Sequence, residues 1–196
     1  MGLLIRSMKA PKVLAWVVAC GYLCSTSPIA WSDVFDRSEY RVKAAFLYNF
    51  ARFVTWPSDD SNAASTPIRI CTYGSDPFGV ELDAVHGKMA RGRVIEVSRM
   101  VSASELHSCQ ILYVAKNDDL ENVLEMSSGA NILTVGEGDR FAELGGVIRL
   151  RIDEKSRRLE DRVSIGLDIN MTAAERASLK ISSRMLKLAR IVGDKR

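Results

Sequence analysis

The stretch QILYVAKNDDLENVLEMSSGANILTVG, residues 110–136, decides the fold. Its beginning, Gln110–Ala115, is almost continuously apolar, as expected for a strand that is covered on both faces. The pattern DDLENVLEMSS then predicts an amphipathic helix, which Gly129 closes. Asn131–Gly136 returns to a strand pattern. A strand, a helix and a second strand in this order predict two parallel strands joined by a helical crossover.

The same alternation continues on both sides of this unit. Upstream, Ile68–Gly74 and Arg93–Val97 predict two further strands with short helices between them. Downstream, Val147–Ile152 and Val163–Ile169 alternate in polarity on either side of a charged turn, which predicts a hairpin. We therefore expect an α/β fold with a mainly parallel sheet, helices on both faces, and a C-terminal antiparallel hairpin at the sheet edge.

A long C-terminal helix is also expected. Thr172 and Glu175 have the spacing of a capping box, and apolar positions after them recur at helical spacing to about Val192. The other side of this helix carries the basic residues Arg176, Lys180 and Arg184. These residues are candidates for binding an acidic partner or a lipid surface. An ordinary solvated helix face is the favoured interpretation, because the chain after residue 32 is otherwise neutral.

The segment YRVKAAFLYNFARFVTWP, residues 40–57, holds six of the 11 aromatic residues that follow residue 32. It predicts a helix over about 37–54 that ends before Pro57. Three phenylalanines recur at helical spacing and are predicted to face the core: Phe46, Phe50 and Phe53. Tyr48 and Trp56 lie off this stripe. They are candidates for contacts with a partner protein, because tyrosine and tryptophan are favoured interface anchors.

Residues 1–32 have the three parts of a secretory signal peptide. A basic head without acids is followed by the apolar run Val13–Cys24 and by a small-residue exit at Ala30–Ser32. We predict cleavage near Ser32, export, and a single domain over 33–196. A retained membrane anchor is the less favoured alternative, because the apolar run is shorter than the ~20 residues that span a bilayer.

Removal of this segment changes the charge balance. The chain has 27 Lys and Arg residues and 24 Asp and Glu residues, and residues 1–32 hold three of the basic ones and no acid. Residues 33–196 therefore carry 24 of each, and their formal net charge is zero. A neutral domain has no bulk field that attracts nucleic acid, so no nucleic-acid partner is expected.

Cysteine counting predicts one disulfide. Cys20 and Cys24 leave with the signal, and Cys71 and Cys109 remain as an even pair in an oxidising compartment. Two buried free thiols are the alternative to this bridge. A lipoprotein cut before Cys20 is a second alternative for the N-terminus, but it would leave Cys24 as an odd thiol.

Few residues support catalysis. His86 and His107 have no metal-ligand spacing, and the sequence has no nucleophile elbow and no phosphate-binding loop. We predict a protein that is not an enzyme and needs no metal or cofactor. Two loops that follow predicted strands are candidate ligand sites, because ligands bind at the carboxyl ends of parallel strands, although their glycines also fit plain turns. Their candidate residues are Ser75, Asp76, Phe78, Gly136, Asp139 and Arg140.

Six segments between about Tyr40 and Val192 have a family resemblance: YRVKAAFLYNFARFVTWP, CTYGSDPFG, GKMARGRVIEV, SCQILYVA, ILTVGEGDRFAELGGVI and INMTAAERASLKISSRMLKLARIV. In these segments the chain resembles the YfiR family of periplasmic proteins. This resemblance implies a non-catalytic regulator that binds the periplasmic sensor domain of a membrane-bound diguanylate cyclase and represses it. Lower cyclic-di-GMP signalling and less biofilm follow from that. The resemblance also implies a homodimer and an outer-membrane lipoprotein that sequesters the repressor.

The resemblance bears on the cysteines too. Cys71 and Cys109 match cysteine positions of the family. Some members have a second cysteine pair near the region 145–152, which this sequence lacks, so redox control through a second bridge is not expected. The alternative function is a small-ligand sensor that acts on a membrane signalling protein through the two strand-end loops. A hydrolytic enzyme is less favoured, because a nucleophile and a base are missing.

Overall fold

The computed structural model describes residues 31–60, 66–115, 119–152 and 163–193. The predicted export signal, residues 1–32, lies outside these ranges except for its last two residues. The helices are α1 (Trp31–Phe53), η1 (Pro57–Asp60), α2 (Val80–Asp83), η3 (Ala103–Ser108), α3 (Leu120–Ser127), α5 (Met171–Arg176) and α6 (Ser183–Leu186). The strands are β1 (Val54–Thr55), β2 (Ile68–Tyr73), β3 (Met89–Ala90), β4 (Arg93–Ser98), β5 (Ile111–Val114), β6 (Leu133–Gly136), β7 (Ile148–Ile152), β8 (Ile165–Asn170), β9 (Lys180–Ile181) and β10 (Ala189–Val192).

Eight strands form one sheet in the order β10-β8-β7-β6-β5-β2-β4-β3, and β1 pairs separately with β9. All neighbours from β4 to β7 are parallel, which confirms the predicted crossover of β5, α3 and β6. The predicted hairpin is present as the antiparallel pair of β7 and β8. Because β10 pairs in parallel with β8 and forms the edge, the hairpin lies one strand inside the edge.

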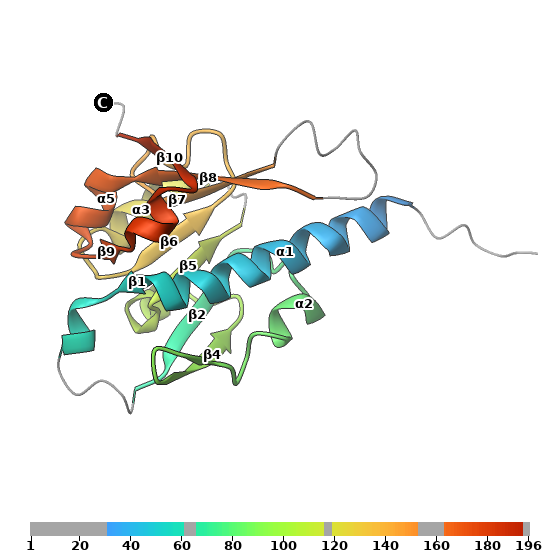
Figure 1. Ribbon diagram of the computed structural model, residues 1–196, viewed down its shortest axis with the longest axis horizontal. Helices are drawn as coiled ribbons and strands as arrows, with labels where there is room; N and C mark the ends of the chain where they lie inside the picture. The colour runs from blue at the N-terminus through green and yellow to red at the C-terminus, as the bar shows by residue number, and fades with distance from the viewer. Residues whose placement is uncertain (1–30, 61–65, 116–118, 153–162, 194–196) are drawn as a thin grey trace, which may run out of the picture.

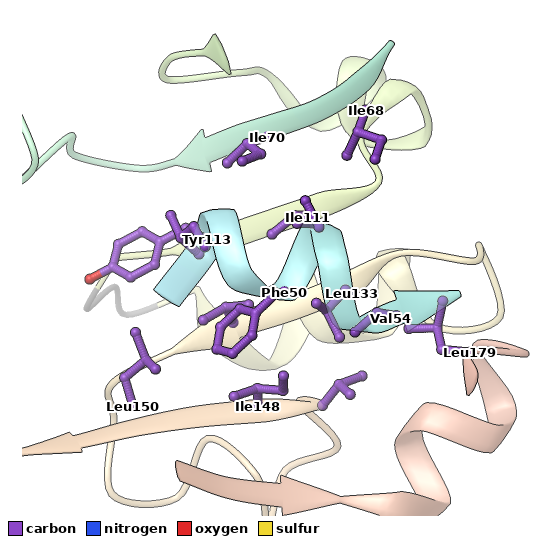
Figure 2. Packing of buried hydrophobic residues seen from close by; sticks show 14 of the residues in the cluster. Phe50, Val54, Ile68, Ile70, Ile111, Tyr113, Leu133, Ile148, Leu150 and Leu179 are labelled. Carbon is purple, nitrogen blue, oxygen red and sulfur yellow. The ribbon is translucent and has the colours of Figure 1, made fainter. Parts of the chain in front are cut away.

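Each face of the sheet has its own apolar core, because successive side chains of a strand point to opposite faces. On one face, Phe50 of α1 packs with Leu133 and Ile148, as Figure 2 shows. On the other face, Leu112 packs with Val123 of α3. The predicted arrangement with helices on both faces is therefore confirmed.

The predicted disulfide is confirmed. Cys71 in β2 is bonded to Cys109, which directly precedes the Gln110–Ala115 run, and their Cα atoms are 5.9 Å apart. Both residues are buried in the core beneath α3 and η3. The bridge links β2 to the start of β5, its neighbour in the sheet.

The predicted long C-terminal helix is wrong, since this segment forms α5, β9, α6 and β10 in turn. α5 is capped by Asn170, whose side chain accepts a hydrogen bond from Ala173 N–H at 3.0 Å. It ends because Ser178 adopts a φ of 55° and Leu179 N–H donates to Ala174 O at 2.9 Å, a typical closure of a helix end. The residues that follow pair with β1, so tertiary pairing overrides the helical periodicity.

The predicted N-terminal helix is present as α1, which starts earlier than expected and lies across one face of the sheet (Figure 1). Its buried residues are Glu39, Lys43, Ala44, Leu47, Phe50 and Ala51. Phe46 and Phe53 are only half-buried. Trp56, which was expected to be available to a partner, is 2% exposed, and its indole N–H donates to Gln110 O at 3.2 Å. Trp56 is therefore a core residue, because the chain after α1 turns inward against the start of β5.

Candidate partner-binding surface

Three parts of the chain meet at a basic pocket of about 380 Å³: the end of α1, the turn between β3 and β4, and the segment from β9 to α6. The pocket is lined by Arg52, Phe53, Thr55, Arg91, Lys180, Ile181, Ser182 and Arg184. Four of these side chains are cationic and none is acidic. Positive charge gathered in a concave surface favours an acidic ligand or an acidic protein.

The pairing of β1 with β9 builds the basic pocket. Thr55 lies opposite Lys180 in the antiparallel register. Ser182 N–H extends the pairing by donating to Phe53 O at 2.9 Å. The Ser182 hydroxyl in turn accepts a hydrogen bond from Arg184 N–H at 3.2 Å, which fixes the start of α6. The pairing with the end of α1 thus positions Lys180 and Arg184, the two cations that the C-terminal segment contributes to the basic pocket.

Arg91 reaches the basic pocket from a tight turn. Arg91 and Gly92 have φ values of 52° and 80°, and such a pair of left-handed residues suits the two-residue turn between β3 and β4. The Arg91 guanidinium lies 3.5 Å from Asp59 Oδ2. The other oxygen of Asp59 accepts a hydrogen bond from buried Arg93 at 2.7 Å. One carboxylate is therefore shared by two arginines, which leaves an excess of positive charge.

Tyr48 lies beside the basic pocket on α1. Its hydroxyl donates to Met89 O at 3.3 Å. The Arg52 guanidinium is 5.7 Å from the ring centroid, and the Lys88 ammonium is 5.4 Å from it. Cations at these distances are attracted to the face of an aromatic ring. The half-buried ring therefore interacts with two cations.

The structure brings together three of the five residues that were predicted to contact a partner. They are Tyr48, Lys180 and Arg184. Arg176 lies apart from them, at a narrow crevice beside Gly145, and Trp56 is in the core. Arg52 and Arg91 were not predicted as members of this surface. No spacing in the sequence connects them, because only the pairing of β1 with β9 and the β3–β4 turn brings them together.

A buried cluster of charges that the sequence analysis missed lies at the carboxyl ends of β5 and β6. Lys43 has a fully buried side chain, and its ammonium forms an ion pair with Glu39, one turn earlier on α1. The same ammonium lies 2.6 Å from Glu137 Oε1, and the Tyr113 hydroxyl donates to that oxygen. The Lys43 ammonium also lies 4.3 Å from the ring centroid of Tyr40. These contacts join α1 to the ends of two central strands.

Comparison with known proteins assigns the family. The sequence profile of the YfiR/HmsC-like family matches residues 40–190. The chain belongs to this family. No curated protein matches the chain.

Among solved structures, the YfiR/HmsC-like chain is similar to a conserved domain protein from Vibrio cholerae O1 biovar El Tor strain N16961, with 15% identity and a TM-score of 0.47 over 79% of this chain. It is also similar to an ABC domain in complex with L-Trp from Streptococcus pneumonia, with 14% identity and a TM-score of 0.42 over 66% of this chain. The aligned regions span 60% and 57% of those two chains, respectively.

The first predicted ligand loop of this YfiR/HmsC-like chain lines a pocket of about 600 Å³ between α1 and α2. Asp76 and Phe78 contribute to it together with Tyr40. Phe78 is 3% exposed and packs edge-on against Tyr40, so it forms the floor. The Asp76 carboxylate is already paired with Arg99, and Ser75 is exposed.

The second predicted ligand loop lies at a different pocket, of about 430 Å³, so the two loops do not form one site. Asp139 lines this pocket, is 94% exposed at its side chain and pairs with Arg149. Arg140 is exposed. Gly136 is buried, and a Cβ at this position would lie 2.3 Å from the ring of Phe141. Glycine is needed at position 136 because the Phe141 ring packs directly against its backbone.

In the described part of the YfiR/HmsC-like chain, no three His, Cys, Asp or Glu side chains are grouped so that they could hold a metal ion. His86 and His107 are both exposed, and His86 Nδ1 accepts a hydrogen bond from Val97 N–H at 3.2 Å. Within residues 31–60, 66–115, 119–152 and 163–193, no helix has the length and apolar character of a membrane span. The chemistry that the surface offers is ionic and aromatic contact.

Tyr113→Phe is expected to reduce the loss of stability above pH 10. Burial, and then the charge of Glu137, raises the pKa of Tyr113 far above its ordinary value of 10.0. Above that pH the unfolded chain releases this proton while the folded protein keeps it. The free energy of unfolding therefore falls by about 1.4 kcal/mol per pH unit from this group. Urea unfolding at pH 10 and 11 should show that the wild type loses about 1 kcal/mol more than the variant, because the unfolded tyrosine is already half ionised at pH 10. Equal losses would contradict the assignment.

Proposed function

We propose that the chain is a non-catalytic periplasmic regulator, which binds the periplasmic sensor domain of a membrane-bound diguanylate cyclase and represses it. Lower cyclic-di-GMP signalling and less biofilm follow from this activity. Family membership supports the proposal. The observation that carries it is the basic pocket beside Tyr48, which offers a concave, positively charged surface to an acidic protein. Export is part of the proposal, with residues 1–32 cleaved near Ser32 and residues 33–196 forming a single domain in the periplasm.

Repression of this kind needs only differential binding. A cyclase that interconverts between an active and an inactive state is shifted toward the state that the regulator binds more tightly. A shift from 1:99 to 99:1 requires a preference of about 10⁴-fold, or about 5.5 kcal/mol. A few aromatic and charge-pair contacts, each worth about 1.5 kcal/mol or more, account for a difference of this size.

Two further partners belong to the proposal and rest on the family. An outer-membrane lipoprotein that covers the basic pocket would release the cyclase by competition. A homodimer would present two copies of the pocket to a dimeric cyclase, and simultaneous engagement of both would raise the apparent affinity.

Lys180→Glu/Arg184→Glu is expected to relieve repression. The two reversed charges introduce repulsion against an acidic partner, so binding should weaken at least about 30-fold, which is ~2 kcal/mol. The measurement is titration of the exported domain against purified periplasmic domains of the membrane-bound diguanylate cyclases of the source organism. Cyclic-di-GMP in cells that express either protein is the second readout.

Arg140→Glu is the matched control, because Arg140 is an exposed basic residue outside the basic pocket. It should bind as tightly as the wild type. If Lys180→Glu/Arg184→Glu binds the cyclase domain as tightly as the wild type does, the basic pocket is not part of the binding surface. Failure of the wild type to bind any of the cyclase domains would refute the proposed function itself.

A second candidate function is a small-ligand sensor at the pocket between α1 and α2, which has an aromatic floor and a volume of about 600 Å³. A pocket with apolar walls and a few polar groups is the usual form of a ligand site. A rise in melting temperature with one compound of a metabolite screen, without binding of any cyclase domain, would favour this function over the first.

A further inference from the structure

The exposed side of α1 is basic from residue 37 to residue 53. From residue 37 onward its exposed positions are Arg37, Arg41, Ala45 and Arg52, whose spacing places them on one stripe of the helix. The only acid between residues 37 and 53 is Glu39, and it is buried. This stripe, the α1 ridge, is about 22 Å long at 1.5 Å per residue. Its last member, Arg52, also lines the basic pocket.

An apolar patch adjoins the α1 ridge. Met89 and Val94 face each other across the β3–β4 pair, and they are 54% and 44% exposed. Directly opposed residues of an antiparallel pair project from the same face, so the two side chains lie together. Tyr48 completes the patch through its hydrogen bond to Met89 O. Methionine, tyrosine and arginine are enriched in protein interfaces.

The positive charge of this region is not a property of the whole chain. Residues 33–196 are formally neutral, so the α1 ridge and the basic pocket concentrate cations on one face. Among the described residues, Arg37 and Arg41 have no carboxylate within ion-pair distance, and neither have Lys180 and Arg184. Cations without internal partners are available for charge pairs with another molecule.

We propose that the α1 ridge, the apolar patch and the basic pocket form one docking surface for an acidic protein segment whose carboxylates flank an apolar side chain. The inference rests on the proposed function and specifies the chemistry of the cyclase surface that is bound. Figure 1 shows the continuity, with α1 on the outside of the sheet, β9 beside its C-terminal end and α2 and β4 along its other side. A protein segment fits this shape better than a membrane does, because a flat bilayer that rests on the ridge leaves the concave pocket uncovered.

The test separates the charged part of the surface from the apolar part. Arg37→Glu/Arg41→Glu should weaken binding of the cyclase domain at least about tenfold and reduce its dependence on salt, since exposed charge pairs are screened. Met89→Ser/Val94→Ser should weaken binding about tenfold and leave the salt dependence unchanged. The probe is the periplasmic cyclase domain that binds the wild type, titrated at low and high salt. Arg140→Glu again serves as the control.

The outcomes distinguish this inference from the proposed function. If the wild type binds a cyclase domain and both double variants bind it equally well, the docking surface is wrong and the function stands. If the wild type binds none of the domains, both are wrong. A separate experiment measures binding of the protein to vesicles of phosphatidylglycerol and phosphatidylcholine. Vesicle binding that Arg37→Glu/Arg41→Glu abolishes, together with unchanged protein binding, would assign the α1 ridge to a membrane and overturn the inference.

Discussion

Replacing Lys43 with methionine is expected to lower the free energy of unfolding by about 3 kcal/mol. Methionine has a similar length, so the change removes the buried charge and leaves little cavity. The carboxylates of Glu39 and Glu137 then lose the cation between them. Removing one partner of a buried ion pair costs ~3–5 kcal/mol, and the low end applies because the Glu137 side chain keeps 24% exposure to water. Urea unfolding at neutral pH measures the loss.

Two control variants identify the origin of the stability loss in Lys43→Met. Lys43→Met/Glu39→Gln/Glu137→Gln removes the charges on both sides and should recover at least half of the lost stability, since a neutral cluster has no unpaired charge. Arg41→Met changes an exposed cation on the same helix and should alter stability by less than ~0.5 kcal/mol. A loss below ~1 kcal/mol in Lys43→Met would show that the buried cluster does not anchor α1.

The strands of the sheet were predictable from sequence where a short apolar run bounded by turn residues marks them. Gln110–Ala115 and Asn131–Gly136 read as strands because apolar residues fill them and turn residues bound them. Both are strands in the structure, parallel and adjacent, with α3 between them. The order of the outer strands was not predictable in the same way, since nothing in residues 189–192 specifies that they pair beside β8 and cover the hairpin edge.

The prediction of a long C-terminal helix was wrong for a physical reason. The apolar residues of this segment recur at helical spacing, but Ser178 takes a left-handed conformation and the chain then pairs with β1. Leu188, placed on the apolar stripe of the predicted helix, is 80% exposed. Periodicity reports what a segment can form alone, whereas the β1–β9 pairing depends on a contact more than a hundred residues away in the chain.

The candidate surface was predicted in part. Lys180 and Arg184 were selected as one basic helix face, and they line one pocket although they belong to a strand and a different short helix. Lys43 was missed although the sequence contains a signal. It lies four residues after Glu39 and four before Leu47, on the buried stripe of the helix, and a lysine at such a position requires a buried counter-ion. Its second partner, Glu137, follows β6 and only the fold brings it near.

Cys71→Ala/Cys109→Ala is expected to lower the free energy of unfolding by about 4 kcal/mol, because the bridge closes a loop across a sequence separation of 38. Cross-linking reduces the conformational entropy of the unfolded chain by an amount that grows with the loop. Urea unfolding of the oxidised wild type and the variant measures the difference. Reductant should lower the stability of the wild type to that of the variant and leave the variant unchanged. A loss of less than ~1 kcal/mol on reduction would mean that the bridge adds little constraint.

The place of the bridge gives this change a second, local consequence. The loop between Cys71 and Cys109 contains α2, β3 and β4, and so it carries Met89, Val94 and Arg91 of the proposed docking surface. β3 and β4 lie at the edge of the sheet, where few neighbours hold them. Edge segments with few contacts open before the core does, so amide exchange in β3 and β4 should accelerate more in the variant than exchange in β5 and β6. Uniform acceleration across all four strands would indicate a purely global effect. Selective acceleration would mean that oxidation orders one half of the docking surface before any partner binds it.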